Sequence, residues 1–258
     1  MIEPGSLIRS LSGRPAARNF HSFVINEIGQ AIVGGSFPVG STLASDAEMM
    51  ESYGVSRTVL REALKTLEAK GLVEARPKIG TRVSPQSRWN YFDPQVLSWH
   101  FYATLPRPFI EGLFEVRAPL EAQAAERMAQ RRTAEQVRLM KYWLHQMSTA
   151  DSSAEQFGLA CLEIHRVLAD GSGNPLLRSV LGVVELTLAL AVSKGGASVL
   201  PQYATCSIGL HDELIHAIEA GDWAKARAAM EASIALDLAE VLRSDKNGAS
   251  GVTRPSML

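Results

Sequence analysis

Apolar residues recur at helical spacing along most of this chain of 258 residues. The clearest stretch follows Ser56, where the apolar positions lie three or four residues apart and would form one stripe along a helix: Val59, Leu60, Ala63, Leu64 and Leu67. The Ser56 hydroxyl can cap the start of this helix, and Gly71 stands where a glycine commonly ends one. The pattern predicts an amphipathic helix with a polar side open to solvent.

A second, shorter helix is expected just upstream. Ser45 and Glu48 have the spacing of a capping box, in which each side chain satisfies a free backbone N–H at a helix start. The helix would run over 46–53, and Gly54 with Val55 would form a tight turn into the helix that follows. Two helices joined by a short turn that contains glycine form a helix-turn-helix.

Short strands are expected downstream, over 72–76 and 81–83, around Pro77 to Gly80. They would form a small hairpin, the wing of a winged helix. An earlier helix, from about 19 to 33, carries apolar residues that can cover the unit. This order of elements predicts a winged helix-turn-helix domain over residues 19–84.

Beyond a connector at 85–92, nearly everything has a helical pattern, and strand alternation is not seen. The breaks are rich in Gly, Asp, Ser, Asn and Pro. We expect helices at about 94–103, 107–130, 133–149, 153–170, 175–193, 200–220 and 222–243. The fold class expected is therefore mainly α, with an all-α antiparallel bundle at 93–243, a flexible segment at 1–18 and a disordered tail at 244–258.

Charge is distributed unevenly along the chain, although the formal net charge is only −1. Residues 56–88 hold eight Lys or Arg against three Glu, whereas residues 89–258 hold fifteen basic against nineteen acidic residues. A basic segment beside a mildly acidic remainder is typical of a protein that contacts phosphates with one module. Each basic residue taken alone could be a solvated surface charge, and their clustering favours nucleic acid.

The composition of the chain indicates in which cellular compartment the protein works. The first 18 residues lack the apolar core of a signal peptide, and we find no run of about eighteen apolar residues that could span a membrane. The two cysteines, Cys161 and Cys206, do not make a disulfide framework and suit a reducing environment. We expect a cytoplasmic protein without a membrane partner.

From Gly35 to Val83 the chain resembles the GntR superfamily of bacterial transcription regulators, in the motif GVSRTVLREAL…GLV followed by a wing ending GTRV. The resemblance implies DNA contacts from the recognition helix and the wing. The expected DNA-binding residues are Ser56, Arg57, Thr58, Arg61, Lys65, Lys78, Gly80 and Arg82. Two positions depart from the family pattern: Ala47 stands where relatives often carry a DNA-contacting Arg, and Lys78 replaces the first Gly of the usual wing tip.

The second half resembles the FCD effector domain of the FadR subfamily. The motifs are FEVRAPLE at 114–121, His165 followed by Gly-Asn-Pro at 173–175, and His211 leading into AIEAGDWAKA. This resemblance implies a homodimer that binds a palindromic operator and responds to a small carboxylate. The connector at 88–99 resembles the galactonate-responsive branch of the subfamily, which implies a sugar acid such as galactonate as the effector.

The FCD resemblance also implies a divalent cation held by one Asp and three His. Here Cys161 stands at the position of the Asp, four residues before His165, and Ser233 stands at the position of the last His. Cys161, His165 and His211 could still bind Zn²⁺, because thiolate and imidazole are competent zinc ligands. The alternative is that Cys161 is a small core residue and the histidines bind the effector directly. With two usual ligands absent, we expect a metal-free or weakly metal-binding pocket.

Arg117 and Glu121 lie one helical turn apart and could simply form an ion pair along the helix. The family position instead makes Arg117 an anchor for an effector carboxylate, which a guanidinium can bind bidentately. The expected ligand-binding residues are Arg117, Glu121, Cys161, His165, His211 and Ser233.

The function expected from the sequence is a ligand-responsive transcription regulator, with repression relieved by the ligand. A regulator of another organic-acid or fatty-acid pathway and an architectural DNA-binding protein stay open as alternatives. An enzyme is not expected, because Cys161, Glu163 and His165 are not accompanied by an oxyanion-hole loop or a glycine-rich phosphate loop.

Overall fold

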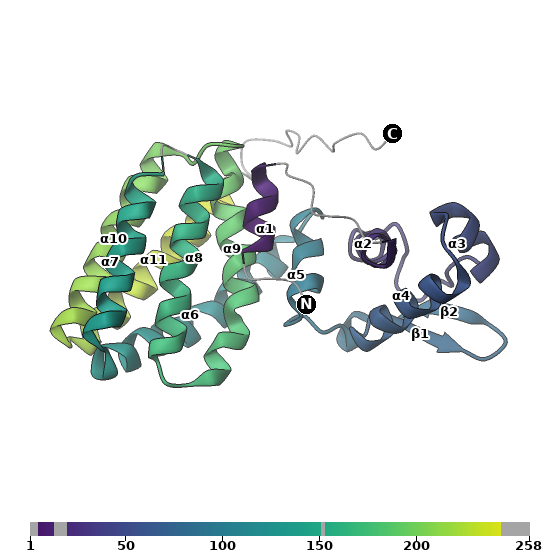
Figure 1. The fold of residues 1–258 in the computed structure, drawn as a ribbon, viewed down its shortest axis with the longest axis horizontal. Coiled ribbons are helices and arrows are strands. Elements are labelled where there is room, and N and C mark those ends of the chain that lie inside the picture. The colour runs from purple at the N-terminus through teal and green to yellow at the C-terminus, as the bar shows by residue number, and fades with distance from the viewer. Residues whose placement is uncertain (1–4, 13–19, 151–152, 244–258) are drawn as a thin grey trace.

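The computed structural model describes residues 5–12, 20–150 and 153–243. Two bodies lie side by side, and the helix α5 (Pro94–Phe101) stands between them (Figure 1). We call the smaller body, built from α2 to α4 and a hairpin, the reader domain. The larger body, built from α6 to α11, is called the effector bundle.

The reader domain consists of α2 (Phe20–Val33), α3 (Asp46–Tyr53), α4 (Arg57–Ala69), β1 (Val73–Arg76) and β2 (Gly80–Val83). The capping box at the start of α3 is formed: the backbone N–H of Glu48 donates to the Ser45 hydroxyl, and its carboxylate accepts from the Ser45 N–H at 2.8 Å. The two strands pair antiparallel, with Val73 opposite Val83 and Arg76 opposite Gly80. The predicted winged helix-turn-helix is confirmed.

At the wing tip, Lys78 adopts a backbone conformation that is costly for a residue other than glycine. Lys78 has a φ of 65° and Gly80 a φ of 105°, so a non-glycine residue occupies the left-handed region here. At the other end of the hairpin, Gly71 has a φ of 80°, and a Cβ there would lie 2.0 Å from the carbonyl oxygen of Arg88. Gly71 is therefore required both for its backbone angle and for the close passage of the connector.

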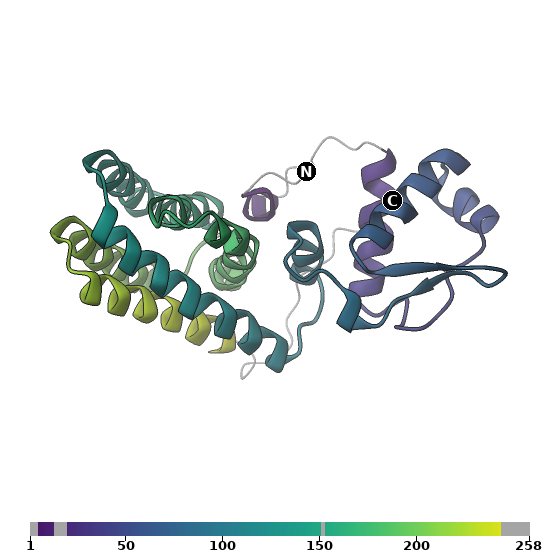
Figure 2. The same ribbon diagram turned by 90° about the horizontal axis from the view of Figure 1, so that it is seen from below.

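The effector bundle contains α6 (Arg107–Arg131), α7 (Ala134–Ser148), α8 (Ala154–Gly171), α9 (Leu181–Val192), α10 (Pro201–Ala220) and α11 (Trp223–Arg243). The helices run beside one another around one apolar core (Figure 2). The expected all-α bundle is confirmed, with one difference in detail. The stretch 175–193 is not a single α-helix, because the 3₁₀ turns η3 (Pro175–Val180) and η4 (Ser193–Gly195) flank α9.

Helix α5 contributes to both bodies. Trp99 and Val96 are buried in the core of the reader domain, whereas Leu97, on another side of the helix, is buried in the core of the bundle. The Trp99 indole N–H donates to the Asn26 side chain on α2 at 2.9 Å. Asp93 caps α5 and also accepts a hydrogen bond of 2.6 Å from Lys70, at the end of α4. The end of α4 is thereby tied to the start of the helix that bridges the two bodies.

The N-terminal segment differs from the flexible stretch that the sequence predicts. Residues 5–12 contain the short helix α1 (Ser6–Arg9) and the 3₁₀ turn η1 (Ser10–Ser12), and α1 packs beside α8 and α9 of the effector bundle (Figure 1). Leu7 and Ile8 are buried in the core of that bundle. The rest of the predicted flexible segment, and the tail predicted at 244–258, lie outside the described residues.

Within the described residues, one stretch is long and apolar enough to cross a membrane by length and composition. It is Pro175–Val192, with a mean hydropathy of 1.8, although the sequence predicts no membrane span. The stretch includes Arg178 and Glu185, and 61% of it is buried inside the protein. Because η3 and α9 lie within the effector bundle, we interpret it as core.

Candidate functional site

The exposed face of α4 carries polar and basic side chains. Ser56 caps the helix by accepting from the Val59 N–H, and the helix then turns its apolar stripe, including Leu60 and Leu67, into the reader core. Arg57, Thr58, Arg61 and Lys65 are all exposed on the other side. Among the described residues, Arg57 and Arg61 make no ion pair that would occupy their guanidinium groups.

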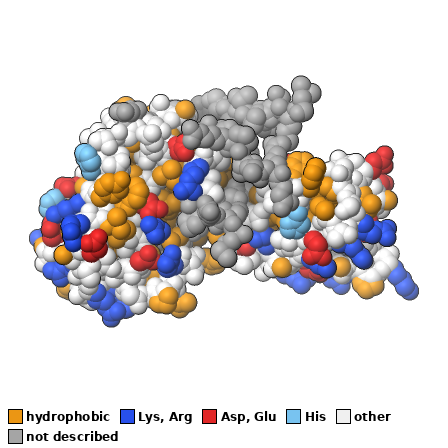
Figure 3. Space-filling model, in the orientation of Figure 1, with side chains coloured by type: hydrophobic (Ala, Val, Ile, Leu, Met, Phe, Trp, Pro, Cys, Tyr) orange, Lys and Arg blue, Asp and Glu red, His pale blue; other side chains and the backbone are white. Residues whose placement is uncertain are grey.

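A groove of about 850 Å³ lies between α4 and the wing. Its lining includes Arg57, Arg61 and Lys65 from the helix, with Arg76 and Gly80 from the wing. Lys and Arg side chains mark the lower edge of the reader domain (Figure 3). Backbone at the wing tip and guanidinium groups on the helix therefore face one open groove, as recognition of a nucleic-acid backbone requires.

Two of the predicted DNA-binding residues, Arg82 and Lys65, have partners within the protein. Arg82 donates from Nε to the Gly40 carbonyl at 2.6 Å, so it braces the wing against the preceding loop. Lys65 forms an exposed ion pair of 2.7 Å with Glu62, which costs little to open. Lys78 is exposed at the wing tip, and Ala47 is exposed at the start of α3. The structure brings Arg57, Thr58, Arg61, Lys65 and Gly80 to the groove, whereas Arg82 points to the other face of the hairpin.

Arg117 is the centre of a polar cluster inside the effector bundle. It is fully buried, and its Nε donates to Glu121 at 2.6 Å. Its Nη1 donates to Asp237 on α11 at 2.7 Å and to Thr187 on α9 at 3.1 Å. Its Nη2 lies 3.4 Å from Nε2 of His165 on α8. One guanidinium thus joins four helices of the bundle.

The charges in this cluster hold each other ionised. Burial alone would raise the pKa of Glu121, but the hydrogen bond from His165 and the ion pair with Arg117 outweigh burial and lower the pKa to about 2. For Arg117, burial is likewise outweighed by Glu121 and Asp237, which raise its pKa above the ordinary value. Both partners of the buried pair are therefore charged at neutral pH.

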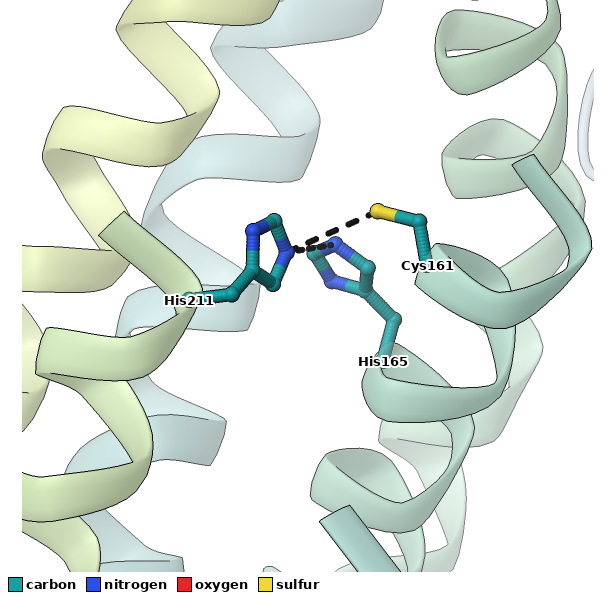
Figure 4. Close-up of side chains that lie close together, drawn as sticks. All are labelled: Cys161, His165 and His211. Carbon is teal, nitrogen blue, oxygen red and sulfur yellow. Dashed lines mark hydrogen bonds between the residues drawn. The ribbon is translucent and has the colours of Figure 1, made fainter. Parts of the chain in front are cut away.

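Cys161, His165 and His211 converge from α8 and α10 (Figure 4). Nε2 of His211 lies 3.4 Å from Nε2 of His165 and 3.5 Å from the Cys161 sulfur. Both Nδ1 atoms face acceptors: that of His165 lies 2.6 Å from the Glu121 carboxylate, and that of His211 lies 2.7 Å from the Ser207 carbonyl. The hydrogen-bond partners therefore place a proton on Nδ1 of both rings. Each Nε2 then carries a lone pair, and the two Nε2 atoms face one another.

Two of the three donor distances match those of a zinc site. With Zn–N of about 2.05 Å and Zn–S of about 2.3 Å, a tetrahedral ion places two nitrogens about 3.4 Å apart and a nitrogen and a sulfur about 3.5–3.6 Å apart. All three ligand atoms lie within 4.8 Å of one another. The carboxylate and the carbonyl that face the Nδ1 atoms are the kind of acceptors that orient zinc-binding histidines. Burial lowers the pKa of His211 to about 4, which keeps its ring neutral, but it also raises the pKa of the Cys161 thiol, so a bound metal would have to displace that proton.

The Ser233 hydroxyl takes no part in the hydrogen bonds of the cluster. Its hydroxyl is buried and has no partner among the described residues. Ser233 and Asp237 lie one turn apart on α11, so both face the same side of that helix.

Three further residues of the cluster were missed in the sequence. Tyr203 donates to the second oxygen of Asp237 at 2.7 Å, and Thr187 contacts Arg117. Asp237 could have been found, because it lies one turn after Ser233 on the expected final helix. Thr187 and Tyr203 carry no such signal.

One small cavity adjoins the cluster. A cavity of about 10 Å³ adjoins Glu121 and His165, and its other walls are apolar side chains such as Leu120, Leu168 and Val184. This volume is about that of one water molecule. Any larger ligand has to move the surrounding helices apart.

Comparison with known protein families matches both halves of the chain. Residues 20–83 match the family described as bacterial regulatory proteins, gntR family. Residues 112–236 match the FCD domain. The two matches coincide with the reader domain and with most of the effector bundle.

Individual proteins give the same result. The HTH-type transcriptional regulator YieP of Escherichia coli (strain K12) is 35% identical over 166 residues, which cover 64% of this chain and 72% of that protein. The galactonate operon transcriptional repressor of the same strain is 30% identical over 197 residues, which cover 75% of this chain and 86% of that protein. These relatives are regulators and not enzymes, as the sequence predicts.

A solved structure supports the fold. The structure described as "Lar controls the expression of the Listeria monocytogenes agr system and mediates virulence" superposes with a TM-score of 0.62 at 15% identity. The match covers 89% of this chain and 99% of that one. At this identity the likeness concerns the arrangement of helices and the wing.

Proposed function

The chain belongs to the GntR family of bacterial regulatory proteins and carries an FCD domain, and on this premise we propose that it represses transcription as a homodimer bound to a palindromic operator. We further propose that a small carboxylate, bound in the effector bundle, relieves the repression. Its place of action is the cytoplasm, where the DNA is.

The exposed face of α4 is the observation that carries the proposal. Within the described part of the chain, Arg57 and Arg61 form no ion pair, and they stand beside an open groove whose other wall is the wing. Arginine is the side chain best suited to read guanine edges and to contact phosphates. One such helix reads only a short half-site, so a dimer on two related half-sites gives the specificity that a regulator needs.

The buried cluster supports an anionic effector only if a cation accompanies it. Arg117 already faces two carboxylates, Glu121 and Asp237, so a third carboxylate would add an uncompensated negative charge. We therefore propose that Cys161, His165 and His211 hold Zn²⁺, although the depleted ligand set by itself predicts a pocket without metal. Bound zinc supplies positive charge and an open coordination position for a carboxylate oxygen.

The effector class has two candidates. A sugar acid such as galactonate is supported by the galactonate operon repressor, 30% identical to this chain. The apolar walls of the cavity, including Leu120 and Leu168, favour instead an acid with an apolar chain. Either ligand exceeds the present cavity, so its binding would favour a different helix packing and shift the DNA-binding equilibrium.

The proposed function can be tested by fluorescence anisotropy on DNA from the upstream region of the gene. The purified protein is titrated with and without ZnCl₂, and with aldonic acids, galactonate included, and short fatty acids. Tight binding that one acid relieves supports the proposal and selects the effector class. If no acid changes the binding, the protein still binds DNA but control by a carboxylate is contradicted. If the protein binds no DNA specifically, its function as a transcription regulator is contradicted.

A further inference from the structure

The short helix α1 precedes the reader domain in the chain, yet it packs against the effector bundle. Ile8 is fully buried and Leu7 nearly so, both within the bundle core. On α8, a Cβ placed on Gly158 would lie 3.0 Å from the Cγ2 of Ile8. The bundle therefore has a small residue where Ile8 enters, and α1 occupies a fitted position.

Glu185 on α9 holds the start of this helix. Its Oε1 accepts the backbone N–H of Leu7 at 2.7 Å and that of Ile8 at 3.4 Å. The N-cap residue of α1, Gly5, has no side chain that could do this. Because a helix of four residues is not stable alone, α1 depends on the acceptor that α9 supplies.

The same segment reaches the bridging helix. The hydroxyl of Ser10 lies 2.9 Å from that of Tyr102, the residue that ends α5. Since α5 carries Trp99 into the reader core, α1 and η1 contact both the bundle and the end of the connection to the reader. Residues 5–12, which precede the reader domain in the chain, and α5, which follows it, are thus both in contact with the bundle.

Helix α9 connects these attachments with the buried cluster. Leu97 of α5 packs against Gly182 at the start of α9, where an added Cβ would lie 3.1 Å from the Cδ1 of Leu97. Glu185 then holds α1, and Thr187 accepts from Arg117. A displacement of α9 by less than one turn would alter all three contacts at once.

We propose that the contact between Glu185 and α1 is a latch that fixes the orientation of the reader domain and that opens when α9 moves. The proposal rests on the proposed function, since it concerns how the effector bundle controls the reader. With the latch closed, each reader is held for its half-site. With the latch open, the reader gains orientational freedom and specific binding weakens.

The test compares Glu185→Leu with the matched control Glu185→Gln in the full chain. Leucine removes the acceptor, whereas glutamine retains an oxygen for the N–H groups of Leu7 and Ile8. Two readouts are taken: hydrogen exchange of the Leu7 and Ile8 amides, and anisotropy on specific and nonspecific DNA. We expect Glu185→Leu to speed exchange on the order of 100-fold and to weaken specific binding about fivefold or more, with glutamine close to the unmodified protein.

A second variant, Ile8→Asp, opens the latch from the other partner without changing the bundle helices. It should reproduce both effects of Glu185→Leu. Fast exchange at α1 with unchanged DNA affinity in both variants would overturn the latch, as would preserved protection of α1 in Glu185→Leu. If the unmodified protein binds no specific DNA, the proposed function fails instead, which is a separate result.

The link through α9 is tested by Thr187→Val, which removes the hydroxyl that accepts from Arg117 and keeps the side-chain shape. We expect faster exchange at Leu7, with intact helix content. Unchanged exchange there would show that the cluster does not communicate with α1. This readout requires neither zinc nor an effector.

Discussion

The guanidinium of Arg117 and the carboxylate of Asp237 lie 2.7 Å apart, although 120 residues separate them in the sequence. Both side chains are at most 1% exposed. Glu121 binds the same guanidinium from one turn further along α6. A single cation therefore compensates two buried anions, and the cluster ties α6 to α11 by charge as well as by packing.

Replacing Arg117 by Met should lower the free energy of unfolding by about 3–5 kcal/mol, because two carboxylates lose their buried partner. Urea unfolding measures this change. The control is Arg227→Met, whose half-exposed pairs with Glu126 and Glu231 should cost no more than about 1 kcal/mol. Equal losses in the two variants would contradict the central role of the cluster.

Acid should destabilise the bundle through Glu121. Its pKa is lowered to about 2 in the folded protein, from about 4.3 in an unfolded chain. The stabilisation is thus complete above about pH 4.3 and is lost as the pH falls toward 2. Glu121→Gln should show a flatter dependence of unfolding on pH in this window, while Glu231→Gln on the surface keeps the original slope. Identical slopes in all three proteins would refute the assignment.

Zinc should bind at one ion per chain after dialysis against ZnCl₂ and removal of excess metal. His211→Ala should abolish the bound zinc, because only two of the converging donors would be left. His216→Ala and Cys206→Ser change exposed residues of the same types and should retain it. An unmodified protein without bound zinc would instead support the metal-free pocket expected from the sequence.

Arg57→Ala should weaken specific operator binding by about 10- to 100-fold and nonspecific binding far less, if its guanidinium reads a base. Anisotropy on operator and scrambled DNA separates the two. Arg138→Ala, on the exposed surface of α7, is the matched control and should change neither. Equal losses on both DNAs would assign Arg57 to a phosphate.

Gly29→Ala should separate α2 from α5. A Cβ at this position would lie 2.6 Å from the ring of Trp99, so we expect a loss of about 1–3 kcal/mol in unfolding free energy. Gly112→Ala, where nothing lies within 4 Å of the added carbon, should stabilise α6 by up to about 1 kcal/mol. Thermal unfolding of the two variants provides the comparison, and a neutral Gly29→Ala would contradict the close contact.

The reader domain could be predicted from the sequence because its determinants are local. The capping box at Ser45, the cap at Ser56 and the glycine at 71 specify where helices begin and end without reference to distant residues. The wing tip is the exception, because Lys78, which replaces a glycine of the family pattern, has a φ of 65° that its own side chain disfavours. There the hairpin imposes the backbone conformation on the residue.

The buried cluster could be predicted only in part. His165 and Cys161 share a helix face, so their proximity follows from spacing, and Arg117 and Glu121 form the ion pair that was the alternative to an effector anchor. Thr187 and Tyr203 come from other helices and are defined by packing alone. The docking of α1 was not predictable for the same reason, since its cap comes from Glu185, more than 170 residues away.

Helix α5 determines where the DNA-binding module ends, which matters for recombination and for protein engineering. A fragment cut at the connector would leave the reader core without Val96 and Trp99 and the bundle without Leu97. A transferable DNA-binding cassette from this protein therefore extends through Phe101, and its recipient has to present a small residue where Gly182 meets Leu97. Exchange of effector specificity between such proteins therefore has to preserve this contact.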